Sequence, residues 1–153
     1  MTAPWTPPDP PQPVAHALQA GLGACEPTLR AMSHDTLYAP YEAQSGWDAK
    51  DPKGHVFQSV AGIRYPGKEP PNALAALIAA PRAGGGCDGV QVQVYPVPVT
   101  CDAVEAAAKG GKRIADLQGV HVLLDAHKTR MFLVAGANAT CVIVSVDSKY
   151  GAP

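Results

Sequence analysis

The chain has 153 residues, of which 46% are hydrophobic and 16% charged, and its formal net charge is −1. A chain of this length suits one domain and can bury about 70% of the surface that it exposes when unfolded. The near-neutral charge argues against nucleic acid or an anionic membrane as partner, and the apolar runs are too short for a transmembrane segment.

Residues 1–13 are rich in proline, which restricts the backbone to extended conformations, so we expect a tail or linker there. This opening has neither the charged nor the apolar region of a signal peptide. We interpret it as the start of a mature chain from which the signal peptide was removed. The abundant alanine, glycine and proline are typical of a GC-rich bacterial gene, and residues 14–150 are expected to form a single α+β domain.

A helical pattern begins after the proline-rich segment, because apolar residues recur at steps of three and four. The residues of this stripe are Val14, Leu18, Leu22, Cys25, Leu29 and Met32. Pro27 cannot lie inside a continuous helix, so the pattern predicts a break at 23–26 and a second helix that starts beside the proline.

Residues 33–55 combine three aromatic side chains, Tyr38, Tyr41 and Trp47, with turn-forming and charged residues. Rigid aromatic side chains on a loop can form a recognition surface at low entropic cost. They can equally belong to a flap that folds over the core, and the sequence leaves both readings open.

Six segments read as strands: 56–65, 72–80, 89–97, 119–124, 131–135 and 141–147. The segment 72–80 also fits a helix, but the glycine-rich loop that follows it favours a hairpin. Thr100 resembles an N-cap, Asp102 lies in the first turn, and Lys109 and Gly110 mark the end of a helix over 101–109. The predicted fold is α+β: N-terminal helices and an antiparallel sheet of five or six strands, with one inserted helix.

The four cysteines predict two disulfides and an oxidising compartment. Between Cys87 and Cys101, three valines alternate with Gln91, Gln93 and Tyr95 as in a half-buried strand. An extended strand of that length reaches ~45 Å, whereas disulfide-bonded Cα atoms lie ~5.5 Å apart, so these two cysteines should not pair. We prefer Cys25–Cys87 with Cys101–Cys141 over Cys25–Cys101 with Cys87–Cys141.

Two alternatives would give these residues a chemical role. Cys101 at a helix N-terminus could be a nucleophile with a histidine as base, as in a small hydrolase or transferase. His121, Asp125 and His127 share a strand parity that suits zinc or iron ligands, although the segment from Asp125 reads more readily as a hairpin loop.

No complete catalytic motif is present in the sequence, so we expect a binding protein rather than an enzyme, without cofactor or metal. The leading hypothesis is a periplasmic or secreted binding module, such as an accessory subunit of an envelope complex or an inhibitor or immunity-type protein. Its partner would be another protein, contacted through Tyr38, Tyr41 and Trp47. The alternatives are the Cys101 enzyme and a metal-binding protein that uses His121 and His127.

Overall fold

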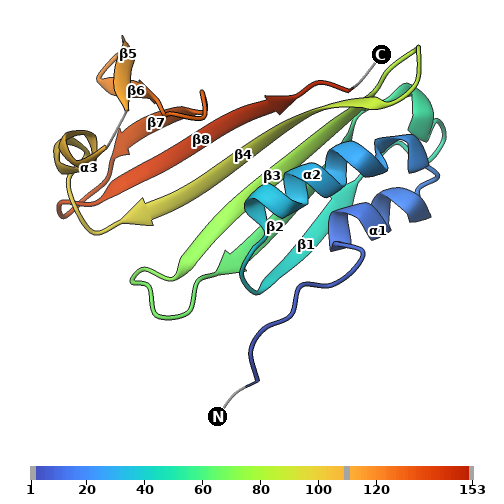
Figure 1. Ribbon diagram of the computed structural model, residues 1–153, viewed down its shortest axis with the longest axis horizontal. Helices are drawn as coiled ribbons and strands as arrows, with labels where there is room; N and C mark the ends of the chain where they lie inside the picture. Colours follow the sequence, from blue (N-terminus) through green and yellow to red (C-terminus); the bar gives the residue numbers. More distant parts are fainter. Residues whose placement is uncertain (1–2, 109–110, 152–153) are drawn as a thin grey trace.

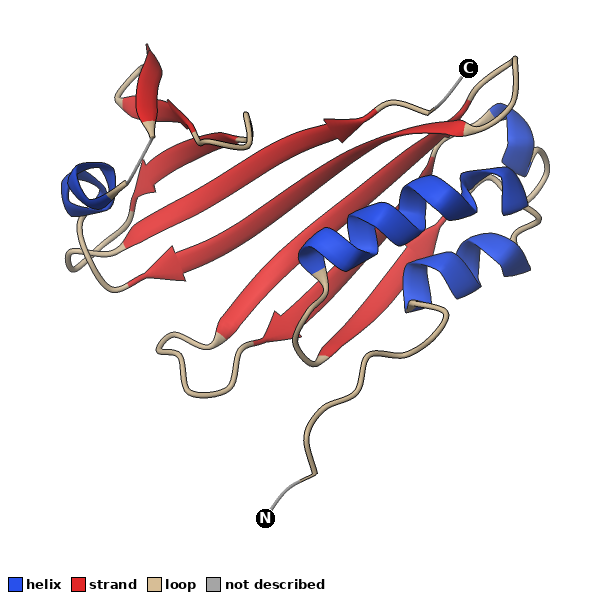
Figure 2. Ribbon diagram, viewed as in Figure 1, coloured by secondary structure: helices blue, strands red, loops and turns tan. Residues whose placement is uncertain are grey.

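A computed structural model describes residues 3–108 and 111–151, which form one antiparallel sheet with helices packed on one face (Figures 1 and 2). The α+β class is confirmed, but the sheet of the described residues has eight strands rather than five or six. The strands are β1 (Tyr41–Gly46), β2 (Phe57–Arg64), β3 (Asn72–Pro81), β4 (Cys87–Val97), β5 (Lys112–Leu117), β6 (Val120–Leu124), β7 (Arg130–Ala135) and β8 (Cys141–Lys149). The α-helices are α1 (Gln12–Gln19), α2 (Glu26–Thr36) and α3 (Cys101–Ala107).

The two strands that the sequence pattern missed, β1 and β5, are the two edges of the sheet, whose order is β1-β2-β3-β4-β8-β7-β6-β5. An edge strand has a neighbour on one side only and is often short and polar. Their sequences, YEAQSG and KRIADL, therefore lack the apolar alternation of the inner strands. The segment 72–80 is a strand, as the glycine-rich loop after it predicted.

The helix predictions are largely confirmed. A short 3-10 turn over Gly23–Cys25 separates α1 from α2, and Pro27 occupies the first turn of α2. Thr100 caps α3, because its Oγ1 accepts a hydrogen bond from the backbone N–H of Ala103 at 3.1 Å. The predicted end signals of this helix, Lys109 and Gly110, lie outside the described residues. No described helix is long and apolar enough to cross a membrane.

The sheet consists of two similar halves, a repeat that was not visible in the sequence. In each half a helix precedes a four-stranded meander, and the last strands, β4 and β8, pair antiparallel at the centre of the sheet. The final hairpins match in register, because Pro81 pairs with Cys87 as Ala135 pairs with Cys141. Val92 and Val146, which follow these cysteines at the same spacing, pair with each other and mark a local two-fold axis.

The two disulfides are related by the same local two-fold axis. Cys25 precedes α2 and is bonded to the first residue of β4, Cys87; Cys101 begins α3 and is bonded to the first residue of β8, Cys141. The preferred pairing is thus confirmed, and no described cysteine is free. Because β4 and β8 run in opposite directions, the disulfides fix α2 and α3 over opposite ends of the central strands (Figure 1).

The first half contains the larger core, between α1, α2 and strands β2 to β4. Apolar residues of the predicted helical stripe are buried there, except Leu18, which is 45% exposed because Ala17 occupies the inward position instead. Gly89 permits close contact between α2 and β4, since a Cβ at this position would lie 2.7 Å from Thr28 and 2.8 Å from Met32.

The second half contains a smaller core under α3, on the same face of the sheet. Its buried residues are Leu123, Leu133, Cys141 and Ile143. None of the residues of α3 itself is fully buried, although Val104 packs against this cluster.

The central part of the opposite face of the sheet is apolar, and no described helix packs on that face. Residues that pair directly across antiparallel strands share a face. One such row runs from Leu74 through Val94, Val144 and Phe132 to Val122. Val90, Val92 and Val94 therefore point away from the helices, and the polar residues between them point toward the helix side.

Candidate functional site

A trough of about 620 Å³ crosses the helix face of the sheet between α2 and the second half. The disulfides hold α2 and α3 at opposite ends of β4 and β8, and the middle of these strands stays uncovered. The trough therefore lies beside the local two-fold axis and is built from both halves.

The floor of the trough is polar and comes from the two central strands. Gln91 and Gln93 of β4 lie directly opposite Asp147 and Ser145 of β8. The Oε1 atom of Gln91 is buried and has no hydrogen-bond partner among the described residues. An unpaired buried acceptor costs about 1–3 kcal/mol, so a hydrogen-bond donor that reached this atom would stabilise the floor of the trough.

The end of α2 forms one wall, and it is held there by an ion pair. The Nζ of Lys149 lies 2.7 Å from Oδ2 of Asp35 and 3.8 Å from Oδ2 of Asp147. Burial is the largest single effect and raises the pKa of Asp35, but the hydrogen bond and charge of Lys149, with further hydrogen bonds, together outweigh it, and the pKa falls below its usual value. The same hydrogen bond raises the pKa of Lys149, so both groups are charged at neutral pH.

Tyrosines flank the trough where α2 ends. Tyr38 is 61% exposed, and its ring lies 5.7 Å from that of Tyr65. An adjoining hollow of about 240 Å³ shares three lining residues with the trough, Tyr38, Gln93 and Tyr95, and is also lined by Tyr65. Burial, followed by the neighbouring Tyr38 and Asp125, raises the pKa of Tyr95, so its hydroxyl stays protonated.

The loop between β6 and β7 forms the opposite wall. Oδ1 of Asp125 accepts hydrogen bonds from the backbone N–H groups of His127 and Thr129, each at 2.8 Å. This is the hairpin turn that the sequence favoured over a metal-binding strand. It places Asp125, His127 and Thr129 along the side of the trough.

The three predicted contact residues lie in different surroundings. Tyr38 lines the trough. The hydroxyl of Tyr41 accepts a hydrogen bond from the backbone N–H of Gln12, and its ring meets Trp5 edge-on at 6.3 Å. Trp47 stacks on the buried Phe57 with ring centroids 6.0 Å apart and packs against the larger core, so it is a flap residue.

Cys101 has no thiol in this oxidised structure. Its sulfur is bonded to that of Cys141 at 2.03 Å. A disulfide sulfur is not a thiolate nucleophile, so the structure provides no catalytic role for Cys101 in this state.

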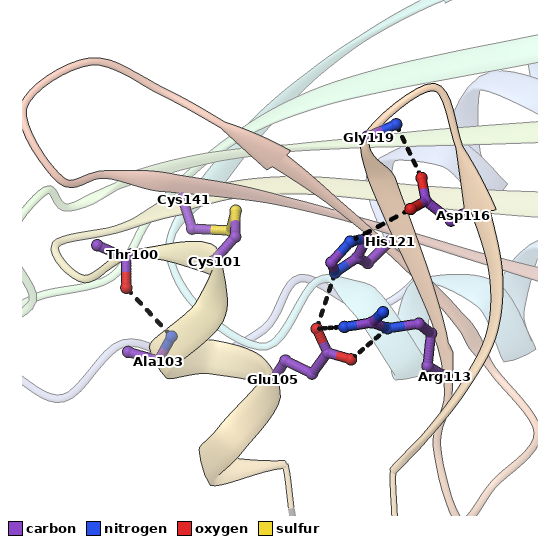
Figure 3. A network of polar contacts seen from close by, with 9 residues as sticks. All are labelled: Thr100, Cys101, Ala103, Glu105, Arg113, Asp116, Gly119, His121 and Cys141. Atoms are coloured by element: carbon purple, nitrogen blue, oxygen red, sulfur yellow. Dashed lines mark hydrogen bonds and ion pairs between the residues drawn. A yellow bond between two sulfur atoms is a disulfide. The ribbon is translucent and has the colours of Figure 1, made fainter.

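His121 and His127 also lie in different places, His121 under α3 and His127 beside the trough. Nδ1 of His121 lies 2.9 Å from Oε2 of Glu105, whose carboxylate also accepts two hydrogen bonds from Arg113, at 2.6 and 2.9 Å (Figure 3). Asp102, Glu105 and His121 have ligand atoms within 4.8 Å of one another. The guanidinium of Arg113 already neutralises the central carboxylate, so we interpret this group as an ion-pair network that attaches α3 to β5 and β6.

Of the residues that line the trough, Tyr38 was predicted as a contact residue, and Asp125 and His127 as alternative metal ligands; the others were not predicted as a site. Gln91 and Gln93 were recognised only as the polar positions of a strand. The missed signal is that both central strands carry polar residues at the same alternate positions, QVQ in β4 and SVD in β8. A strand with both faces buried would not carry polar residues at these alternate positions, so the pattern indicates that one face of β4 and β8 is uncovered.

Comparison with protein-family models, curated proteins and solved structures gave no match to this chain, so the candidate site is interpreted from its own geometry.

Proposed function

We propose that this protein is an exported, non-enzymatic binding module, periplasmic or secreted, that receives a protein partner in the trough. The disulfides support an oxidising compartment, since such bonds persist outside the reducing cytosol. An accessory subunit of an envelope complex and an inhibitor or immunity-type protein both fit this proposal.

The observation that carries the proposal is the uncovered polar strip on the helix face of the two central strands. Gln91 and Gln93 interrupt the apolar pattern where α2 and α3 leave the strands bare, and the exposed ring of Tyr38 stands beside them. Pockets that combine aromatic side chains with a few convergent polar groups are typical of binding sites. Tyrosine is also enriched among residues that dominate protein–protein binding energy.

Capture from an envelope extract by the immobilised protein tests this proposal. We expect Tyr38→Ala to lose partners that the wild type retains, while its thermal stability stays close to that of the wild type. Tyr150→Ala is the matched control, because Tyr150 is 81% exposed and does not line the trough. If the wild type and Tyr38→Ala retain the same partners in the same amounts, the trough is not the binding surface.

A further inference from the structure

Two side chains on the floor of the trough offer hydrogen-bond acceptors, Gln91 and Asp147. On the floor, Oε1 of Gln91 is buried without a partner among the described residues. The side-chain NH2 group of the same residue donates one hydrogen bond to Asp35. Asp147 is the cross-strand neighbour of Gln91, and its Oδ1 accepts from the backbone N–H of Ser148 at 3.0 Å.

Carboxylates also outnumber cations in the trough. Its described lining contains three aspartates, Asp35, Asp125 and Asp147, and one lysine, Lys149. The ammonium of Lys149 already contacts Asp35 and Asp147. The hydrogen bonds of Asp125 within the described chain come from neutral backbone N–H groups and reach only Oδ1, so no protein cation compensates this carboxylate.

Aromatic rings lie beside the uncompensated carboxylate. Tyr38, Tyr95 and Asp125 all line the trough, and the Asp125 carboxylate contributes to the raised pKa of Tyr95. A cation is attracted to the face of a tyrosine ring as well as to a carboxylate, and partial desolvation strengthens both interactions. An anion would meet excess negative charge here, and an apolar group would leave Gln91 unpaired.

We propose, on the basis of the binding function above, that the trough receives an organic cation, an alkylammonium or guanidinium group. Asp125 supplies the opposite charge, Tyr38 and Tyr95 supply aromatic contact, and Gln91 accepts a hydrogen bond. The cation can belong to a free amine or to a lysine or arginine side chain of the partner protein.

Titrations followed by amide NMR spectra distinguish these sources. The probes are cadaverine, a capped glycine peptide with a central lysine, and the same peptide with norleucine in place of lysine. We expect saturable shifts in residues 91–95, 125–131 and 145–149 with the lysine peptide, and none with the norleucine peptide. Equal binding of cadaverine indicates a free amine, whereas tighter binding of the peptide indicates a side chain of a protein.

Asp125→Asn is the test variant, because an asparagine oxygen can still accept the backbone hydrogen bonds that form the turn. It should weaken lysine-peptide binding about tenfold, the effect expected for loss of one charge-assisted hydrogen bond. Glu42→Gln is the matched control, since Glu42 is exposed on β1 and pairs with Gly62 on the opposite face of the sheet. It should leave the affinity unchanged.

Failure of this inference differs from failure of the proposed function. If the norleucine peptide binds the trough as well as the lysine peptide does, or if Asp125→Asn and Glu42→Gln bind alike, the cation is rejected and the trough remains a binding site. If neither cationic probe shifts the amide signals of trough residues while capture still depends on Tyr38, the cation proposal is rejected and the proposed binding function stands. If capture is also independent of Tyr38, both proposals fail.

Discussion

The two halves of the sheet share a topology but hold their helices in different ways. In the first half, α1 and α2 bury many side chains against β2 to β4, and the disulfide lies inside that core. In the second half, α3 buries no residue completely and is attached to the sheet by its disulfide and an ion-pair network. A small helix at one end of the central strands leaves room for the trough, so the weaker packing of α3 is linked to the existence of the site.

The largest expected effect comes from removal of the Cys25–Cys87 bond. This bond closes a sequence separation of 62 residues, and loop entropy alone predicts a loss of about 4 kcal/mol in Cys25→Ala/Cys87→Ala. Both sulfur atoms are buried, so a cavity adds to the loss. Urea unfolding without reductant measures it.

The matching double variant, Cys101→Ala/Cys141→Ala, removes the disulfide that closes a sequence separation of 40 residues. We expect a smaller loss of global stability, because α3 can detach while the sheet remains folded, and we expect faster amide exchange confined to α3. Equal losses of global stability in the two double variants would contradict the asymmetry between the halves.

Trp47→Ala tests whether the aromatic loop belongs to the core of the first half. Because Trp47 stacks on Phe57, the free energy of unfolding should fall by about 2–3 kcal/mol. Trp5→Ala is the control, since Trp5 is more exposed and contacts Tyr41 only edge-on, and it should change stability much less. A Trp47→Ala variant as stable as the wild type would return Trp47 to the list of contact candidates.

Thr100→Ala removes the cap of α3 and should lower stability by about 1 kcal/mol. Thr100→Ser keeps the side-chain oxygen and should restore most of the loss. Thermal unfolding of both variants measures the effect, and an equal loss in the serine variant would show that the cap is not its cause.

The smallest effect concerns pH. Hydrogen bonds from Arg113 and His121 lower the pKa of Glu105 to about 2. A carboxylate with a lowered pKa in the folded state stabilises the protein above its usual pKa and loses this contribution as the pH falls. The melting temperature of the wild type should therefore exceed that of Glu105→Gln at pH 6, and the difference should shrink between pH 4.5 and 2. A difference that stays constant over that range would contradict the role of the network.

The inner part of the fold could be predicted from the sequence, because it depends on local patterns. Pro27, Thr100 and the alternating valines each determine a helix break, a cap or a strand through local backbone and side-chain preferences. The edge strands could not be predicted in this way, since their pairing depends on a neighbour that the local sequence does not specify.

The site was harder to predict for a related reason. Tyr38 was identified because an aromatic residue among turn-forming and charged residues is a local signal. Gln91, Asp125 and Asp147 form a site only because β4 and β8 pair and because the disulfides keep α2 and α3 apart. These are long-range relations, which neither composition nor spacing expresses.

If the proposed function holds, partners bind on the trough side of the sheet rather than on its bare apolar face. Photocrosslinking in envelope extract compares the two faces directly. A photoreactive phenylalanine analogue replaces Tyr38 in the trough or Leu74, which is 41% exposed on the apolar face. We expect a discrete crosslinked partner from position 38 and none from position 74; crosslinks from position 74 alone would contradict binding in the trough.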